Sequence, residues 1–127
     1  RSAVERFRGS EAHCILVSPS IEEGFDFPGD QARYQIIAKV PFMDNRDPLV
    51  KARSESDKQY LNHEVALTIT QMAGRIVRSA TDFGETFIVD DHWSWFSQAA
   101  KSHFPEWFRR AWRRSVNLPK PMPLNNN

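Results

Sequence analysis

The chain has 127 residues, of which 40% are hydrophobic and 26% charged, and this is the size and composition of one ordinary globular domain. Because it has one cysteine and no apolar run of about 18 residues, the sequence excludes a disulfide framework, a four-cysteine zinc site, an all-cysteine iron–sulfur cluster and a membrane span within the chain. The net charge of +1 conceals an asymmetry, since residues 1–91 carry 11 basic and 15 acidic residues whereas residues 92–127 carry 6 basic and one acidic residue.

The N-terminal residues predict the end of a helix and then a strand. Residues 2–9 are short and polar and indicate a helix end, with Gly9 as the residue that follows the last turn. Residues 13–17 form a compact apolar run, which suits a buried strand. Within this run we expect Cys14 to be a small core residue rather than a nucleophile.

A loop and a second strand follow. Residues 18–29 contain two glycines and two prolines and so predict a loop, but the isoleucine and two phenylalanines among them indicate that it is held against the domain. Residues 34–41 predict a strand that Pro41 ends. Residues 44–57 are polar and charged, and we expect an exposed excursion there.

The hydrophobic period becomes helical from residue 57 or 58 to residue 79. Apolar residues at spacings of four, four, three and four form one stripe along this helix, namely Leu61, Val65, Ile69, Met72 and Ile76. This stripe predicts that one side of the helix packs on the core. Residues 81–84 then predict a turn, and residues 85–89 predict a short strand.

The C-terminal residues predict two more helices, over residues 92–101 and 103–114. The second has aromatic and apolar side chains at helical spacing, namely Phe104, Trp107, Phe108, Ala111 and Trp112. Such a stripe is more often core, with its neighbouring arginines on a solvated face, but aromatic and arginine side chains together can also bind a single strand of nucleic acid. Residues 117–127 contain three prolines and predict a flexible tail.

Three polar side chains share one side of the long predicted helix. Gln71, Arg75 and Arg78 are spaced i, i+4 and i+7 and fall within a sector of roughly 60°. Paired guanidinium groups offer forked donors of permanent charge, which suit phosphate oxygens. Gly74 lies beside the apolar stripe, and because a mid-helix glycine costs roughly 1 kcal/mol, we expect a ligand or another backbone to approach it closely. Alternatively, the arginines form surface salt bridges and Gln71 faces water.

The segment that contains these residues resembles a known helicase motif. Residues 71–78, QMAGRIVR, are similar to motif VI of superfamily-two helicases, and about 47 residues upstream residues 23–27, EGFDF, are similar to motif V in its EGxDF form. The strand with Val40-Pro41-Phe42, the turn at residues 81–84 and Phe104-Pro105-Glu106-Trp107 also match. Over roughly residues 10–112 the chain therefore resembles the XPD/DinG family of DNA helicases.

Strands separated by helices predict an α/β domain with a mainly parallel sheet. The resemblance implies that this domain is RecA-like and three-layered, that residues 1–116 form the C-terminal portion of a second RecA-like helicase domain, and that residues 117–127 are a flexible tail. It also implies that ATP binds between this domain and a first RecA-like domain of the same protein, while single-stranded DNA runs across both. The first domain would bind Mg²⁺, because this chain has no GxxxxGK[ST] motif and its Asp90-Asp91-His92 stretch follows motif VI. We therefore expect the chain alone not to hydrolyse ATP.

The resemblance further implies roles for the motif VI residues. Arg75 and Arg78 would be the pair of arginine fingers that reaches the γ-phosphate of ATP from across the cleft. Gln71 would form a hydrogen bond near that phosphate or the attacking water, and Gly74 would belong to the nucleotide site.

The motif V residues would link ATP to DNA. Gly24 would allow close approach of the backbone, and Asp26 would hold either an arginine of motif VI or the ribose; Glu23 also belongs to the pattern. The alternative for Asp26 is a turn-forming residue beside Pro28. Ser18 lies near the position where related helicases place a hydroxyl on a DNA phosphate.

Two functions are thus compatible with the sequence. In the first, the chain is the C-terminal motor half of an ATP-dependent DNA helicase; in the second, it is a non-catalytic module that binds nucleic acid or protein on a RecA-like scaffold. We expect an intracellular, cytoplasmic protein with no secretory leader, no membrane partner and no metal site in this chain.

Overall fold

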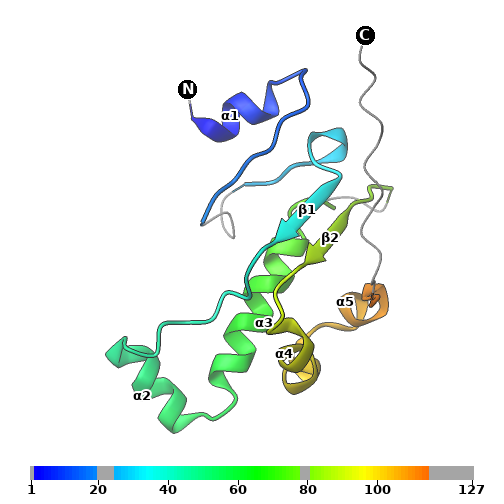
Figure 1. Ribbon diagram of the computed structural model, residues 1–127. Helices are drawn as coiled ribbons and strands as arrows, with labels where there is room; N and C mark the ends of the chain where they lie inside the picture. The colour runs from blue at the N-terminus through cyan, green and yellow to red at the C-terminus, as the bar shows by residue number, and fades with distance from the viewer. Residues whose placement is uncertain (1, 20–24, 78–80, 115–127) are drawn as a thin grey trace.

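A two-stranded parallel sheet lies at the centre of the computed structural model, which describes residues 2–19, 25–77 and 81–114 (Figure 1). Strand β1, Tyr34–Ile37, pairs in parallel with β2, Glu85–Ile88, so that Tyr34 lies opposite Glu85 and Ile37 opposite Ile88. The predicted α/β class with a parallel sheet is confirmed on this small scale. Both strands are shorter than predicted: β1 ends at Ile37, before Pro41, and β2 ends at Ile88.

Helices account for most of the remaining regular structure, and α2 lies away from the sheet, next to α3 (Figure 1). Their bounds are α1 Ala3–Arg8, α2 Pro48–Ser56, α3 Tyr60–Ala73, α4 Trp93–Ala99 and α5 Glu106–Ala111, with single 3₁₀ turns at Gly29–Gln31 and Lys101–His103. The predicted helices at residues 2–9 and 92–101 are confirmed as α1 and α4. No helix within the described residues is long and apolar enough to cross a membrane.

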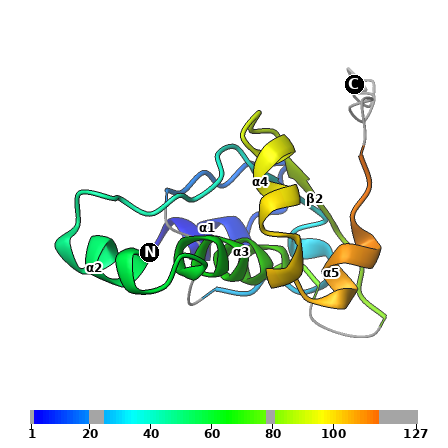
Figure 2. The ribbon, with the colours of Figure 1, turned by 90° about the horizontal axis from the view of Figure 1, so that it is seen from below.

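The core forms where α3 meets the sheet and the two C-terminal helices (Figures 1 and 2). The predicted stripe of α3 contributes the buried Val65 and Ile69, and Ile76 beyond the helix end is buried as well. Phe96 of α4 and Phe108 of α5 belong to the same cluster. Burial of this apolar stripe holds α3 against the sheet. The residues that follow α3 then lie beside the segment that contains Asp26.

The prediction of a buried strand at residues 13–17 is wrong. These residues form no strand, and Ile15 and Val17 are 90% and 86% exposed. Cys14, expected in the core, is exposed too. A strand needs a neighbour that completes its hydrogen-bond ladder, and within the described residues β1 and β2 pair only with each other.

The excursion predicted at residues 44–57 is largely a helix, α2. The carboxylate of Asp47 caps its start by accepting a hydrogen bond from the Leu49 N–H at 2.8 Å. Pro48 occupies the first helical position, where its missing N–H costs nothing and its fixed φ favours the helix. The dipeptide Asp47-Pro48 is therefore a helix start rather than a mark of irregular chain.

The last predicted helix begins later than expected. Residues Lys101–His103 form a separate 3₁₀ turn, and α5 starts at Glu106. Phe104 is extended, with φ −82° and ψ 137°, because the residue before a proline is disfavoured in helical conformation.

Candidate functional site

The segments that contain the two predicted motifs meet at one edge of the sheet. Residues 25–33 lead into β1, and residues 81–84 lead into β2; residues 74–77 follow the end of α3. Since the strands are parallel and in register, the residues that precede them lie at the amino ends of both strands. We call this region, residues 25–33, 74–77 and 81–84, the amino edge.

Asp26 and Arg75 form an ion pair at the amino edge. The Arg75 Nη1 donates to the Asp26 Oδ1 at 3.0 Å, and the side chains are 19% and 39% exposed, respectively. The backbones are joined as well, because the Phe27 N–H donates to the Arg75 carbonyl oxygen at 2.9 Å. The structure thus brings together one residue of each motif from positions 49 residues apart.

Arg75 does not project from α3, and the predicted single helical face for Gln71, Arg75 and Arg78 is wrong in this respect. The helix ends at Ala73, and Gly74 is its C-terminal cap. At the helix end the Arg75 N–H donates to the Met72 carbonyl oxygen at 3.1 Å, three residues back, so the last turn is tighter than an α-helical turn although the apolar stripe continues. Arg78 lies outside the described residues.

Gly74 is therefore not a mid-helix glycine. Its φ is −72°, which any residue can adopt. A Cβ built there would meet the carbonyl oxygens of Gln71 and Thr70 at 3.5 Å, an ordinary contact distance. Among the described residues, the space at Gly74 is therefore open enough for a Cβ.

The loop that carries Asp26 is anchored by its neighbour, Phe27. This side chain is buried, and its ring packs edge-on against Phe7 of α1 at a centroid distance of 5.6 Å. Arg8 of the same helix lies 5.5 Å from the centroid of the Phe27 ring, and its Nη2 donates to the Asp26 carbonyl oxygen at 2.6 Å. The predicted docking of this loop is confirmed for the described residues, and it fixes the direction of the Asp26 carboxylate.

A second ion pair, which the sequence did not indicate, joins the same two segments. The Asp82 carboxylate, 5% exposed, accepts from Arg33 Nη1 at 2.7 Å and from the Gly29 N–H at 3.1 Å. Gly29 has a φ of +59°, a left-handed conformation that favours glycine and turns its N–H toward Asp82. We call the contact of Asp82 with Arg33 and Gly29 the Asp82 clamp.

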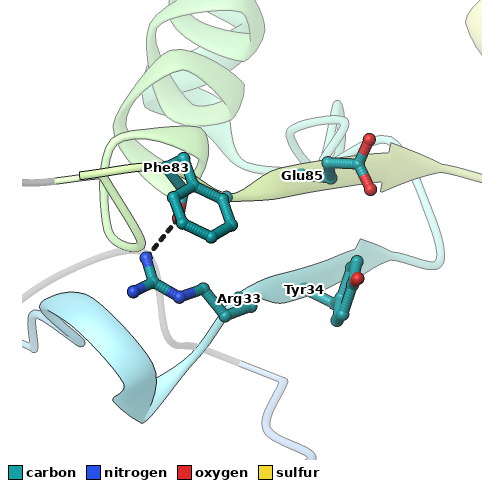
Figure 3. Close-up of a pocket in the computed structure, with 5 residues that line it drawn as sticks. Arg33, Tyr34, Phe83 and Glu85 are labelled. Atoms are coloured by element: carbon teal, nitrogen blue, oxygen red, sulfur yellow. Dashed lines mark hydrogen bonds between the residues drawn. The ribbon is translucent and has the colours of Figure 1, made fainter. Parts of the chain in front are cut away.

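Arg33 is held from several sides. A hydrogen bond to Asp30 is the largest cause that raises the pKa of Arg33 above its ordinary value, and Asp82 adds to it. The guanidinium carbon lies 4.0 Å from the centroid of the Phe83 ring, and Nη1 donates to the Phe83 carbonyl oxygen at 2.7 Å. Figure 3 shows this contact beside a pocket of about 310 Å³, which Tyr34 of β1 and Glu85 of β2 also line.

The opposite edge of the sheet is tied by Asp90. Its carboxylate accepts from the Val40 N–H at 2.8 Å and from the His92 N–H at 3.0 Å. The backbone hydrogen bonds from His92 and Val40, with the His92 side chain, lower the pKa of Asp90 to about 2. A charged carboxylate therefore joins the chain after β1 to the start of α4.

The remaining predicted site residues are less closely grouped. Gln71 is exposed on the last turn of α3, and Ser18 is exposed in irregular chain. Glu23, Gly24 and Arg78 lie outside the described residues. Across residues 2–19, 25–77 and 81–114, no three His, Cys, Asp or Glu side chains are grouped so that they could hold a metal ion.

A guanidinium group has five N–H donors in a fixed fork that matches a phosphate group. The Arg75 guanidinium is held by the carboxylate of Asp26, which belongs to a different segment of the chain. The position of the guanidinium therefore depends on the position of that segment. The amino edge can therefore present a cation to a phosphate and change its position when the Asp26 loop moves.

Comparison with known proteins identifies a family for this chain. Residues 1–111 match the protein family described as the helicase C-terminal domain. The "ATP-dependent DNA helicase YoaA" of Haemophilus influenzae is 36% identical over 90 residues, which cover 64% of this chain and 14% of that protein. The "3'-5' exonuclease DinG" of Bacillus subtilis is 32% identical over 95 residues, or 68% of this chain and 10% of that protein.

A more distant relative matches a longer part of the chain. The "ATP-dependent helicase DinG" of Mycobacterium tuberculosis is 27% identical over 114 residues, or 84% of this chain and 16% of that protein. The matched region is thus a small part of each of these relatives. No solved structure matches the chain. The family match and these relatives show that the chain belongs to the helicase C-terminal domain family of DinG-like and XPD-like helicases.

Proposed function

We propose that this chain is the C-terminal motor half of an ATP-dependent DNA helicase. In this proposal, residues 1–116 are part of a second RecA-like domain of three-layered architecture, which completes an ATP site held mainly by a first RecA-like domain of the same protein. Closure of the cleft brings Arg75 and Arg78 to the γ-phosphate, and hydrolysis drives translocation along single-stranded DNA. Residues 117–127, outside the described residues, would be a tail.

The Asp26–Arg75 ion pair is the observation that carries this proposal. Phosphoryl transfer needs positive charge near the phosphate oxygens in the transition state, and an arginine supplied from a neighbouring domain meets this need. Arg75 is mostly buried and held by Asp26 at 3.0 Å, so its charge is positioned before ATP arrives. Gln71 would assist near the γ-phosphate or the attacking water, and Gly74 would let the nucleotide approach the helix end.

The same ion pair would couple ATP to DNA. Asp26 follows Glu23 and Gly24 in the motif V sequence, and the Phe27–Arg75 backbone hydrogen bond joins the Asp26 loop to the residues after α3. A displacement of the loop by a DNA strand, with Ser18 at a phosphate, would therefore move Arg75 as well. Conversely, an arginine drawn toward the γ-phosphate would pull on Asp26.

The described residues do not form a binding site for Mg²⁺. They contain no cluster of carboxylates or histidines suited to a cation, and the principal charged donor at the amino edge is a guanidinium. This chain would therefore supply contacts to phosphate oxygens, while the first RecA-like domain would supply the Mg²⁺ ligands.

The test is the DNA-stimulated ATP turnover of the longer protein with Arg75→Ala. Loss of an arginine finger lowers turnover by about 10³–10⁵-fold in comparable enzymes, and we expect a decrease of that order. Arg46→Ala is the matched control, because Arg46 also pairs with an aspartate at 2.8 Å but is 91% exposed. Its turnover should stay within about twofold of the original value.

If the Arg75→Ala protein hydrolyses ATP and unwinds DNA as before, Arg75 is not a finger and the non-catalytic binding module becomes the better description. The isolated chain of 127 residues gives a second test. ATP turnover by this chain alone would contradict the proposal that most of the site belongs to another domain.

A further inference from the structure

Four arginines gather at the C-terminal end of the described chain. Arg109, Arg110, Arg113 and Arg114 are all exposed, and we call them the α5 basic surface. The single acidic residue of this region, Glu106, pairs with Arg110 at 2.6 Å. Arg113 donates to the carbonyl oxygens of Arg110 and Trp112, so it follows the helix end. The surface thus keeps a net positive charge that a polyanion would neutralise.

Aromatic packing holds this surface in place. Phe108 of α5 is buried and stacks on Phe104 at a centroid distance of 4.8 Å. The ring of Trp112 packs against that of Trp93 of α4 at a centroid distance of 5.4 Å. Because these rings occupy the inner side of the helix, the arginines are presented outward from a fixed base.

The same helix carries an exposed aromatic ring. Trp107 is 54% exposed, and its ring packs edge-to-face against the ring of Phe108 at a centroid distance of 5.7 Å. Proteins that bind single-stranded nucleic acid combine cationic side chains for the phosphates with aromatic rings on which bases stack. Trp107 and the α5 basic surface have this combination within α5 and the three residues that follow it. A duplex has its bases stacked inside and would leave the indole ring unused.

We propose that α5 binds single-stranded DNA, with Arg109 and Arg114 at backbone phosphates and Trp107 stacked on a base. This inference deepens the proposed function, because it rests on DNA being the polymer on which the protein acts. It concerns a surface of the C-terminal helices, whereas the proposed nucleotide contacts lie at the amino edge. The two proposals can therefore fail separately.

The test measures binding of the full chain to a fluorescent oligothymidylate by anisotropy, without ATP and at several salt concentrations. For Arg109→Ala/Arg114→Ala we expect binding roughly tenfold weaker at low salt. The slope of the logarithm of the binding constant against the logarithm of the salt concentration should become shallower by about 1.4, which is about 0.7 for each lost phosphate contact. Trp107→Ala should weaken binding by roughly fivefold or more, because a stacked base is lost. Arg109→Lys/Arg114→Lys keeps the charge and should keep the salt dependence.

Two matched controls decide whether the effect belongs to α5. Lys51→Ala/Lys58→Ala removes the same charge from exposed positions on and beside α2, and its affinity should change by less than about twofold. Trp95→Ala removes a tryptophan of α4 that is 52% exposed, and should leave binding unchanged. Circular dichroism of each variant checks that the helices persist.

The proposal is overturned if the wild-type chain does not bind the oligonucleotide, or if the lysine control weakens binding as much as the arginine variant. It is also overturned if Trp95→Ala, rather than Trp107→Ala, lowers affinity. The binding assay contains no ATP. Its outcomes therefore stand even if Arg75→Ala leaves the ATP turnover of the longer protein unchanged.

Discussion

The amino edge and the aromatic cluster of α4 and α5 are stabilised in different ways. At the amino edge, charged side chains and backbone hydrogen bonds join segments about 50 residues apart, as in the Asp26–Arg75 pair and the Asp82 clamp. In the aromatic cluster, defined by Trp93, Phe96, Phe104, Phe108 and Trp112, rings pack on one another within about 20 residues of chain.

This difference matters for function. Ring packing is non-directional and depends mainly on buried apolar area, so the aromatic cluster can serve as a fixed base. An ion pair across two segments is directional and can be exchanged for a ligand, because a phosphate can compete with the carboxylate for the guanidinium. The amino edge is therefore suited to respond to a nucleotide, and the aromatic cluster to hold a surface still.

The largest stability effect should come from breaking the aromatic cluster. Phe96 is fully buried, and its ring packs against Trp93 of α4 and against Phe104, so Phe96→Ala should lower the free energy of unfolding by about 3–5 kcal/mol. Urea denaturation monitored by circular dichroism measures this change. Trp95→Ala, at the neighbouring half-exposed position, should cost much less. Similar losses at both positions would show that the cluster is not packed as described.

Breaking the Asp82 clamp should have a smaller effect. Asp82→Ala removes the acceptor of the Gly29 N–H and one of the acceptors of the Arg33 guanidinium, and we expect the free energy of unfolding to fall by about 1–3 kcal/mol. Asp44→Ala removes an exposed pair with Arg46 and should cost less than about 1 kcal/mol. Equal losses would mean that the clamp contributes no more than a surface ion pair.

The smallest effect should come from Asp90, and it should disappear at low pH. Because the pKa of Asp90 is lowered to about 2 in the folded chain, its stabilising contribution is fully present above its ordinary value of 3.8 and is lost as the pH falls toward 2. The difference in unfolding free energy between the original chain and Asp90→Asn, measured across this range, should shrink as the pH decreases. A difference that is independent of pH would contradict the assigned hydrogen bonds.

The sequence predicted the elements whose signals are local. Alternating and apolar runs located both strands, and the stripe from Leu61 to Ile76 located α3. The resemblance to motifs V and VI also led us to expect an arginine of motif VI near Asp26, and the structure contains that contact. The roles of these residues in ATP hydrolysis and DNA binding remain predictions.

The features that escaped prediction depend on tertiary contacts. α3 ends at Ala73 with Gly74 as its cap, and the next residue, Arg75, is joined to Phe27 by a backbone hydrogen bond across 48 residues of sequence. The Asp82–Arg33 pair joins residues 49 apart, and neither residue type signals a partner at that distance. The apolar run at residues 13–17 has strand character, but that character produces no strand unless another strand lies beside it.

The most direct test of the central claim is a double-mutant cycle on the Asp26–Arg75 pair, read out as the DNA-stimulated ATP turnover of the longer protein. If Asp26 acts by positioning Arg75, Asp26→Asn alone should lower turnover, Arg75→Ala should lower it further, and the double variant should be no slower than Arg75→Ala. The account is contradicted if Asp26→Asn lowers turnover by the same factor whether or not Arg75 is present, because the two residues would then act independently.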